Sequence, residues 1–267
     1  MHCKVLNDIN KIHSMFDRSL IRKIFHQRSY KTSAVKSLSA LPATEVQPAT
    51  NVDSNSERKF VNPLRFPDYF EVQNLFTVKD LFDARVHLGH KVGSLNEKMS
   101  PYIFGSRFDH IIFDLEQTAI HLRNALNVTA HIAYRGGIIL FAGHYPQHCQ
   151  LIEQTAIECK EYAMTRYWRR GLFTNSTQLF KGTIRLPDLV IMLNTLNNVL
   201  NQHELVREAA KSNIPSIAVV DSNCDPTIVT YPVPGNDDTP SAIQLYLSLF
   251  KQAILKGKEI RQKEFEN

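Results

Sequence analysis

IPSIAVVD, residues 214–221, is the stretch on which the predicted fold rests. Ile217 to Val220 are apolar without alternation, which is typical of a parallel strand covered by helices on both faces. The polar segment Asp221 to Pro226 follows at once, and the block Pro232 to Asp238 comes shortly after it. Together they mark the carboxyl end of a parallel sheet, where ligands and partners of α/β folds usually bind.

Strands and helices alternate on both sides of this stretch. Between the strands, apolar residues recur at helical spacing, most clearly from Leu115 to Ala133, and Thr239 with Pro240 begins a last helix. The alternation predicts a Rossmann/flavodoxin-like α/β three-layer domain with a mainly parallel sheet. Three earlier apolar runs have the length of strands: Ile111–Phe113, Ile138–Ala142 and Leu189–Leu193.

The chain is expected to divide into four parts: a presequence over 1–39, a linker and extended segment over 40–75, the α/β domain over 76–257 and a C-terminal tail over 258–267. Within the domain, Thr77 with Asp80 predicts a helix N-terminus and Gly89 the stop of that helix. Residues 91–107 are expected to be mostly loop, and residues 199–210 a helix.

Composition limits the class of protein before any motif is considered. A chain of 267 residues that is 43% hydrophobic can bury a sizeable core. No apolar run approaches the roughly 20 residues of a membrane span, so no span is expected. The four cysteines show no metal-binding spacing and are expected to be reduced thiols.

The net charge of +5 lies almost entirely in the first forty residues, which hold eight basic and two acidic residues. Apolar residues recur there near helical spacing among the positive charges, which is the pattern of a mitochondrial presequence. The alternative is a basic arm that binds nucleic acid directly. The rest of the chain has a balance of −1, so its overall charge gives no argument for nucleic-acid binding.

No catalytic, metal-binding or cofactor-binding motif is found in the sequence. Gly136-Gly137 precedes a strand instead of following one, so it is no phosphate loop. The loop from Asp221 resembles a calcium loop, but Pro226 stands where that motif needs Gly. His87 and His90 have no carboxylate or thiol nearby in sequence to complete a zinc site. The prediction is therefore no enzyme, no metal, no cofactor and no small-molecule substrate.

The distribution of charge within the body points to binding surfaces instead. Residues 135–185 have a balance of +4 and residues 186–250 a balance of −5. Arginines beside aromatic rings are typical of RNA contacts, although a solvated surface charge is the alternative for each one, and Trp168 is expected in the core. The candidate RNA-binding residues are Lys91, Lys98, Arg107, Arg166, Arg169, Arg170, Lys181 and Arg185. The candidate protein-contact residues are Asp221, Asp225, Asp237 and Asp238, which would repel RNA.

Six ordered blocks also carry a family resemblance: Ala84 to His90, Asn96 to Gly105, Ile111 to Leu115, Tyr167-Trp168 with Gly171 and Thr174-Asn175, Leu186 to Asp188, and Asp221 to Pro226 with Pro234 to Asp238. They resemble the small-subunit ribosomal protein two family, over residues 76–257. With the presequence, the resemblance implies the mitochondrial version, a structural protein of the small ribosomal subunit in the mitochondrial matrix. Its implied partners are small-subunit rRNA and other small-subunit ribosomal proteins.

Two departures from the bacterial pattern stand out. Bacterial relatives insert a long helical hairpin where this chain has only Ser176 to Leu186, so contacts of that hairpin are expected to be lost or supplied by other proteins. Arg169 and Arg170 replace apolar and Gly residues, so an RNA role for them rests on charge alone. The alternatives to a ribosomal role are a mitochondrial α/β nucleotide-binding enzyme and a free scaffold.

Overall fold

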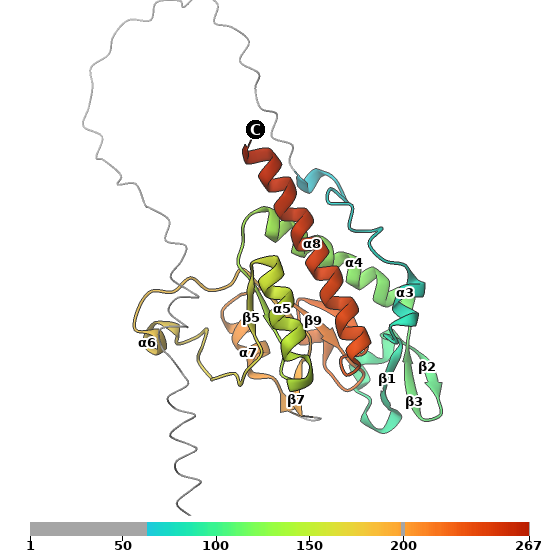
Figure 1. Cartoon of the computed structure of the whole chain (residues 1–267). Helices are drawn as coiled ribbons and strands as arrows, with labels where there is room; N and C mark the ends of the chain where they lie inside the picture. The colour runs from blue at the N-terminus through green and yellow to red at the C-terminus, as the bar shows by residue number, and fades with distance from the viewer. Residues whose placement is uncertain (1–62, 199–200, 267) are drawn as a thin grey trace, which may run out of the picture. The chain divides into compact units, whose positions relative to one another are not determined.

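A five-stranded parallel sheet lies at the centre of the unit Phe66–Asn267, as the computed structural model shows (Figure 1). The structure describes residues 63–198 and 201–266. Of the other unit, Met1–Arg65, it describes only the 3₁₀ turn η1 (Pro63–Arg65). The predicted presequence and most of the predicted linker therefore lie outside the described residues.

The order of the strands is that of a flavodoxin-like fold. The sheet runs β10-β9-β6-β4-β5, and all four pairings are parallel. Numbered along the chain, these five strands lie in the order 2-1-3-4-5, which is the flavodoxin-like arrangement. The predicted α/β fold class is confirmed. The strands are β4 (Ile139–Ala142), β5 (Tyr162–Met164), β6 (Leu189–Met192), β9 (Ser216–Val220) and β10 (Tyr231–Pro234).

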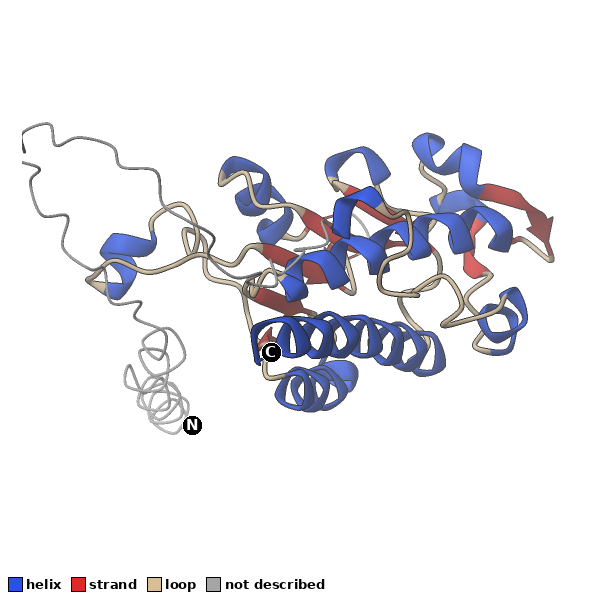
Figure 2. Ribbon diagram, turned by 90° about the horizontal axis from the view of Figure 1, so that it is seen from above, coloured by secondary structure: helices blue, strands red, loops and turns tan. Residues whose placement is uncertain are grey.

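Helices and loops cover both faces of the sheet (Figure 2), which explains why its strands are apolar without alternation. Ile217 and Val219 of β9 point into one core, which α4 (Leu115–Tyr134), α5 (Cys149–Cys159) and α8 (Pro240–Glu266) complete. Ala218 and Val220 point into the other core, beneath α7 (Glu204–Lys211). All five residues of β9 are buried.

Local signals in the sequence explain where α3 and α4 begin. Thr77 and Asp80 form the predicted reciprocal cap at the start of α3 (Val78–Asp83). Asp114 caps α4, where its carboxylate accepts a hydrogen bond from the N–H of Glu116 at 3.0 Å. The buried residues of α4 recur at helical spacing, as predicted. None of the helices in the described ranges combines the length and the apolar character that a membrane span requires.

The region expected to be mostly loop, residues 91–107, instead contributes to an antiparallel sheet, which also contains the strand predicted at Ile111–Phe113. It consists of β1 (Leu88–Lys91), β2 (Ile103–Arg107) and β3 (His110–Phe113) in the order β1-β3-β2, with the turns η2 (Val92–Ser94) and η3 (Glu97–Tyr102). Gly89 does not stop α3, which ends at Asp83; it lies in β1. A methyl group on Gly89 would lie 3.2 Å from both the Phe113 ring and the Ser222 hydroxyl, so glycine permits this close approach.

Two further segments differ from the prediction. Asn201 and Gln202, which were expected to lie in a helix, instead form a short strand, and α7 begins at Glu204. The short edge strand β5 was not predicted, because its three half-buried residues give no apolar run. The remaining elements are η4 (Pro146–His148), α6 (Ser176–Phe180), η5 (Pro226–Ile228), and the hairpin strands β7 (Leu196–Asn198) and β8 (Asn201–Gln202).

The segment that precedes α3 is part of the core. Phe70 and Val72 are fully buried, so the ordered domain begins before Thr77. Glu264 accepts hydrogen bonds from the hydroxyls of Tyr69, at 2.9 Å, and Tyr134. Glu264 belongs to α8, which continues to Glu266 through the residues assigned to a tail.

Candidate nucleic-acid interface

The basic loop, residues 165–187, connects β5 to β6 and contains the short helix α6 at one end of the domain (Figure 1). Arg166 and Arg169 are exposed, and no carboxylate of the described residues lies within ion-pairing distance of either. Tyr167 lies between them in sequence with 80% of its surface exposed. The loop therefore offers two free guanidinium groups and an accessible ring to a partner.

Buried aromatic residues hold the basic loop against the sheet. Trp168 and Phe173 are buried and meet edge to face, with ring centroids 5.0 Å apart, so the prediction of a core Trp168 is confirmed. The buried carboxylate of Glu208 on α7 accepts hydrogen bonds from the backbone N–H groups of Gly171 and, at 3.0 Å, Phe173. Gly171 has a φ of +90°, which favours glycine. These anchors fix the loop while its arginines face solvent.

The other basic residues of the loop differ in their surroundings. Arg170 forms an ion pair with Glu204 at 2.7 Å, and Arg185 forms one with Asp188 at 2.8 Å. All four side chains are at least partly exposed, so these pairs add little stability and leave the cations accessible. Lys181 is exposed and follows the last residue of α6, with its backbone in the left-handed helical conformation. The loop thus brings five of the eight predicted RNA-binding residues into one segment.

The remaining three candidates, Lys91, Lys98 and Arg107, lie on or beside the antiparallel sheet, far from the basic loop. Figures 1 and 2 both place β2 and β3 at the opposite end of the domain from α6. Lys98 pairs with Asp225 at 2.5 Å, so a predicted RNA contact and a predicted protein contact neutralise each other. This pair lowers the pKa of the Asp225 carboxyl below its ordinary value.

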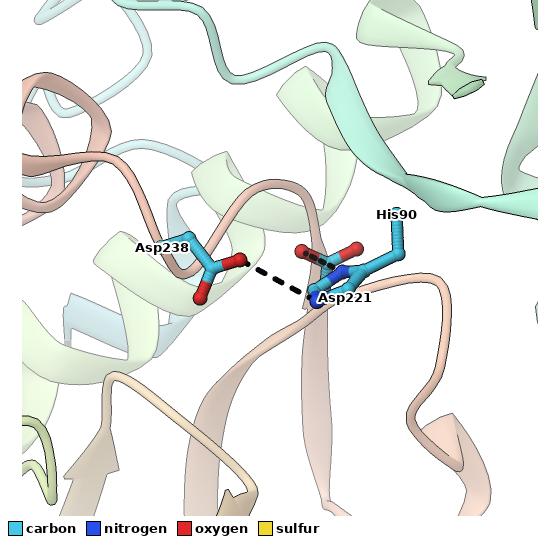
Figure 3. Close-up of side chains that lie close together, drawn as sticks. All are labelled: His90, Asp221 and Asp238. Atoms are coloured by element: carbon cyan, nitrogen blue, oxygen red, sulfur yellow. Dashed lines mark ion pairs between the residues drawn. The ribbon is translucent and has the colours of Figure 1, made fainter. Parts of the chain in front are cut away.

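The acidic strand end, His90, Asp221, Asp237 and Asp238, forms where β9 and β10 stop. Nδ1 of His90 lies 3.1 Å from Asp221, and Nε2 lies 3.4 Å from Asp238, so the ring bridges two carboxylates (Figure 3). The backbone N–H of His90 also donates to the Ser222 hydroxyl at 3.0 Å. The hydrogen bond to Asp221 raises the pKa of His90 to about 9, against the effect of burial. His90 is therefore a cation at neutral pH.

Among the described residues, His90, Asp221 and Asp238 form a group that could hold a metal ion, since their ligand atoms lie within 4.8 Å of one another. A metal ion at this position would have to displace the proton that the carboxylates stabilise on His90. The protonated ring already supplies the positive charge between the carboxylates. Sequence reasoning missed this cluster because its members come from three distant segments.

Burial separates the four predicted protein-contact residues. Asp221 is 1% exposed and Asp237 is also buried, whereas 52% of the Asp238 side chain is exposed. Burial, with Asp221 nearby, raises the pKa of Asp237 well above its ordinary value. Direct contact with a partner is therefore open to Asp225 and Asp238 alone among the four.

The usual ligand position of a flavodoxin-like sheet has close local packing in this chain. That position lies beyond β4 and β6, where the strand order reverses. There the side-chain oxygen of the buried Asn194 accepts a hydrogen bond from the backbone N–H of His144 at 3.0 Å. A methyl group on Gly143 would lie 2.4 Å from Ile152, so the loop after β4 packs tightly on α5.

Comparison of the sequence with known proteins finds a matching family and similar relatives. The family model described as ribosomal protein S2 matches residues 81–185 and 178–257. The chain is 54% identical over 224 residues to small ribosomal subunit protein uS2m of Bos taurus, which covers 84% of this chain and 76% of that protein.

Bacterial proteins are similar over a smaller share of the chain. Small ribosomal subunit protein uS2 of Neorickettsia sennetsu is 34% identical over 230 residues, covering 70% of this chain and 77% of the bacterial one. The uS2 protein of Chelativorans sp. is 34% identical over 225 residues, 70% and 84% of the two chains. The resemblance seen in the ordered blocks is confirmed, and the chain belongs to the ribosomal protein S2 family.

Proposed function

We propose that this chain is a structural constituent of the mitochondrial small ribosomal subunit in the mitochondrial matrix, where it binds small-subunit rRNA and neighbouring ribosomal proteins. Its similarity to a mitochondrial protein of that subunit supports the assignment. Membership of a ribosomal protein family agrees with the prediction that the chain is no enzyme.

The single observation that carries the RNA contact is the direction of the arginines in the basic loop. Arg166 and Arg169 face solvent without an internal carboxylate, while Trp168 between them is buried. A guanidinium group binds phosphate through a rigid fork of donors, and each contact releases counterions. The basic loop is therefore suited to neutralise rRNA phosphates and would make few sequence-specific contacts with the bases.

Asp225 and Asp238 are the proposed contacts to basic neighbouring proteins. They follow the carboxyl ends of β9 and β10, and neither is fully buried. Because carboxylates repel rRNA, this edge of the sheet suits a protein partner better than RNA.

The absence of the bacterial helical hairpin is also part of the proposal. Only the five-residue helix α6 stands between Asn175 and Pro187. The family model matches in two segments that meet at residues 178–185, which supports a deletion at this point. Neighbours of the subunit would then occupy the space that the hairpin fills in bacteria.

The experiment is sedimentation of mitochondrial lysate in a sucrose gradient, with probes for this protein and for small-subunit rRNA at low and raised salt. We expect the wild-type chain to sediment with the rRNA. The variant Arg166→Ala/Arg169→Ala should dissociate from the rRNA at lower salt. The slope of log K for rRNA binding against log salt concentration should become shallower by about two.

The matched control is Lys79→Ala/Arg135→Ala, which removes two exposed cations from α3 and the end of α4. It loses the same charge, so it should keep the wild-type slope if position matters. Equal loss in both variants would contradict the assignment to the basic loop. Sedimentation of the wild type as a free protein would contradict the ribosomal role and favour the free scaffold.

A further inference from the structure

The hairpin tip, Phe104 to His110 between β2 and β3, exposes two large apolar rings. Phe108 is 85% exposed and Phe104 is 79% exposed, the two highest values among the phenylalanine, leucine, isoleucine and valine side chains that the structure describes. Both belong to a hairpin at the edge of the domain (Figure 1). Exposed rings of this size, gathered on one hairpin, mark an interaction site more often than isolated exposed residues do.

The backbone at the hairpin tip adds a second, independent observation. Phe108 has a φ of 48° and Asp109 a φ of 60°, and the flanking Arg107 and His110 pair across the hairpin. Such two-residue turns favour Asn and Gly, which tolerate a positive φ. A phenylalanine in this conformation is unfavourable. Neither burial nor the preference of the turn therefore explains why residue 108 is a phenylalanine.

The positive charge around the hairpin tip favours the binding of an anion. The guanidinium carbon of Arg107 lies 5.4 Å from the centroid of the Phe108 ring. Lys91 on the neighbouring strand β1 is also exposed, and no carboxylate in the described ranges forms an ion pair with Lys91 or Arg107. Asp109 is the one carboxylate in the turn itself. A flat ring beside cations is the arrangement used to stack unpaired bases of RNA.

We propose that the hairpin tip is a second rRNA-binding site, at which the Phe108 ring stacks on an unpaired nucleotide while Arg107 and Lys91 contact its phosphates. This inference rests on the proposed ribosomal function and adds an anchor at the end of the domain opposite the basic loop. Recognition differs between the two sites. The basic loop binds by charge, whereas the hairpin tip binds mainly by stacking and depends less on salt.

The test measures binding of the full chain to protein-free small-subunit rRNA, with Phe108→Gly as the main variant. Glycine is favoured at this φ, so the hairpin should fold at least as well and any loss of affinity reports the ring. We expect about tenfold weaker binding, an unchanged salt slope and recovery with Phe108→Trp. Phe82→Ala, which removes another exposed ring on α3, is the matched control and should bind as the wild type does.

Crosslinking identifies the partner directly. A photoreactive phenylalanine analogue at position 108 should crosslink to rRNA in assembled particles. A crosslink to protein alone, or wild-type affinity in Phe108→Gly, would overturn the stacking site. If the wild-type chain bound neither rRNA nor particles, the proposed function itself would fail, whereas loss limited to the Phe108 variants tests the hairpin alone.

Discussion

The basic loop and the acidic strand end carry opposite charge, but they differ more in where that charge is directed. In the loop, Trp168 and Phe173 are buried, while Arg166, Tyr167 and Arg169 are exposed. At the strand end, Asp221 is buried and its charge is opposed by His90 within the same chain. Both regions suggest binding surfaces when charge is counted along the sequence. The loop leaves Arg166 and Arg169 free for a partner, whereas the strand end buries Asp221 and Asp237 and leaves only Asp238 of its carboxylates exposed.

The difference teaches that a cluster of charge can serve the fold or serve binding, and that burial separates the two. Charges that pair internally in a buried place are costly to disturb. Exposed charges contribute little to stability and are available to partners. Substitutions in the two regions should therefore have opposite profiles, with stability lost in one and affinity lost in the other.

The largest effect is expected for Asp221→Ala. It leaves the His90 cation with only the more distant, exposed Asp238, and it removes a buried acceptor. The free energy of unfolding should fall by about 3 kcal/mol, measured by urea denaturation. Asp238→Ala is the control and should cost less than 1 kcal/mol, since that carboxylate is half exposed. Equal effects of the two substitutions would show that burial does not distinguish the contributions of Asp221 and Asp238 to stability.

Glu208→Ala should have the next largest effect, because it leaves the N–H groups of Gly171 and Phe173 without their acceptor. We expect a loss of about 2 kcal/mol and faster tryptic cleavage within the basic loop. Glu204→Ala removes the exposed partner of Arg170 and should leave both readouts near wild type. A slow cleavage rate in Glu208→Ala would mean that the aromatic rings alone hold the loop.

The contribution of His90 should depend on pH. Because its pKa in the folded chain is raised from 6.5 to about 9, this contribution is complete below pH 6.5 and is lost as pH rises through about 9. The Tm of the wild type should therefore fall over this range, and that of His90→Gln should fall less. Thermal unfolding in buffers from pH 6 to 9.5 measures both. Parallel curves would show that His90 is not protonated as described.

The smallest effect on stability is expected for Arg166→Ala/Arg169→Ala. Neither guanidinium has an ion-pair partner among the described residues, so the free energy of unfolding should stay within about 0.5 kcal/mol of wild type. The same variant is expected to lose rRNA affinity. Substantial destabilisation would show that these arginines serve the fold, and the contrast between the two regions would then disappear.

The elements that could be predicted from sequence are those whose signal is local. The apolar run of β9 and the helical spacing of α4, with Asp114 as its cap, led to the correct class of fold. The strand at Ile111–Phe113 was predicted, but its antiparallel partners were missed because β1 has no apolar run and β2 is largely exposed. Similarly, α7 was placed too early, since residues 199–210 have no clear start signal before Glu204.

The candidate sites follow the same division. The basic loop was found because its arginines lie together in sequence. The pairing of Lys98 with Asp225, and of His90 with Asp221, joins segments that no local spacing connects. The hairpin tip was missed for another reason: Phe108 is apolar, and a single sequence does not show that an apolar ring faces solvent.

The position of Glu264 has a consequence for the order in which the chain folds. Tyr69, near the beginning of the described chain, is held by this residue near its end, and Lys256 of the same helix donates to the carbonyl of Glu71 at 2.9 Å. A ribosome makes the early segment first, so Phe70 must wait for α8 before this part of its packing is complete. Formation of such distant contacts is slow compared with local structure. The packing of the segment around Tyr69 is therefore completed only after α8 has been made.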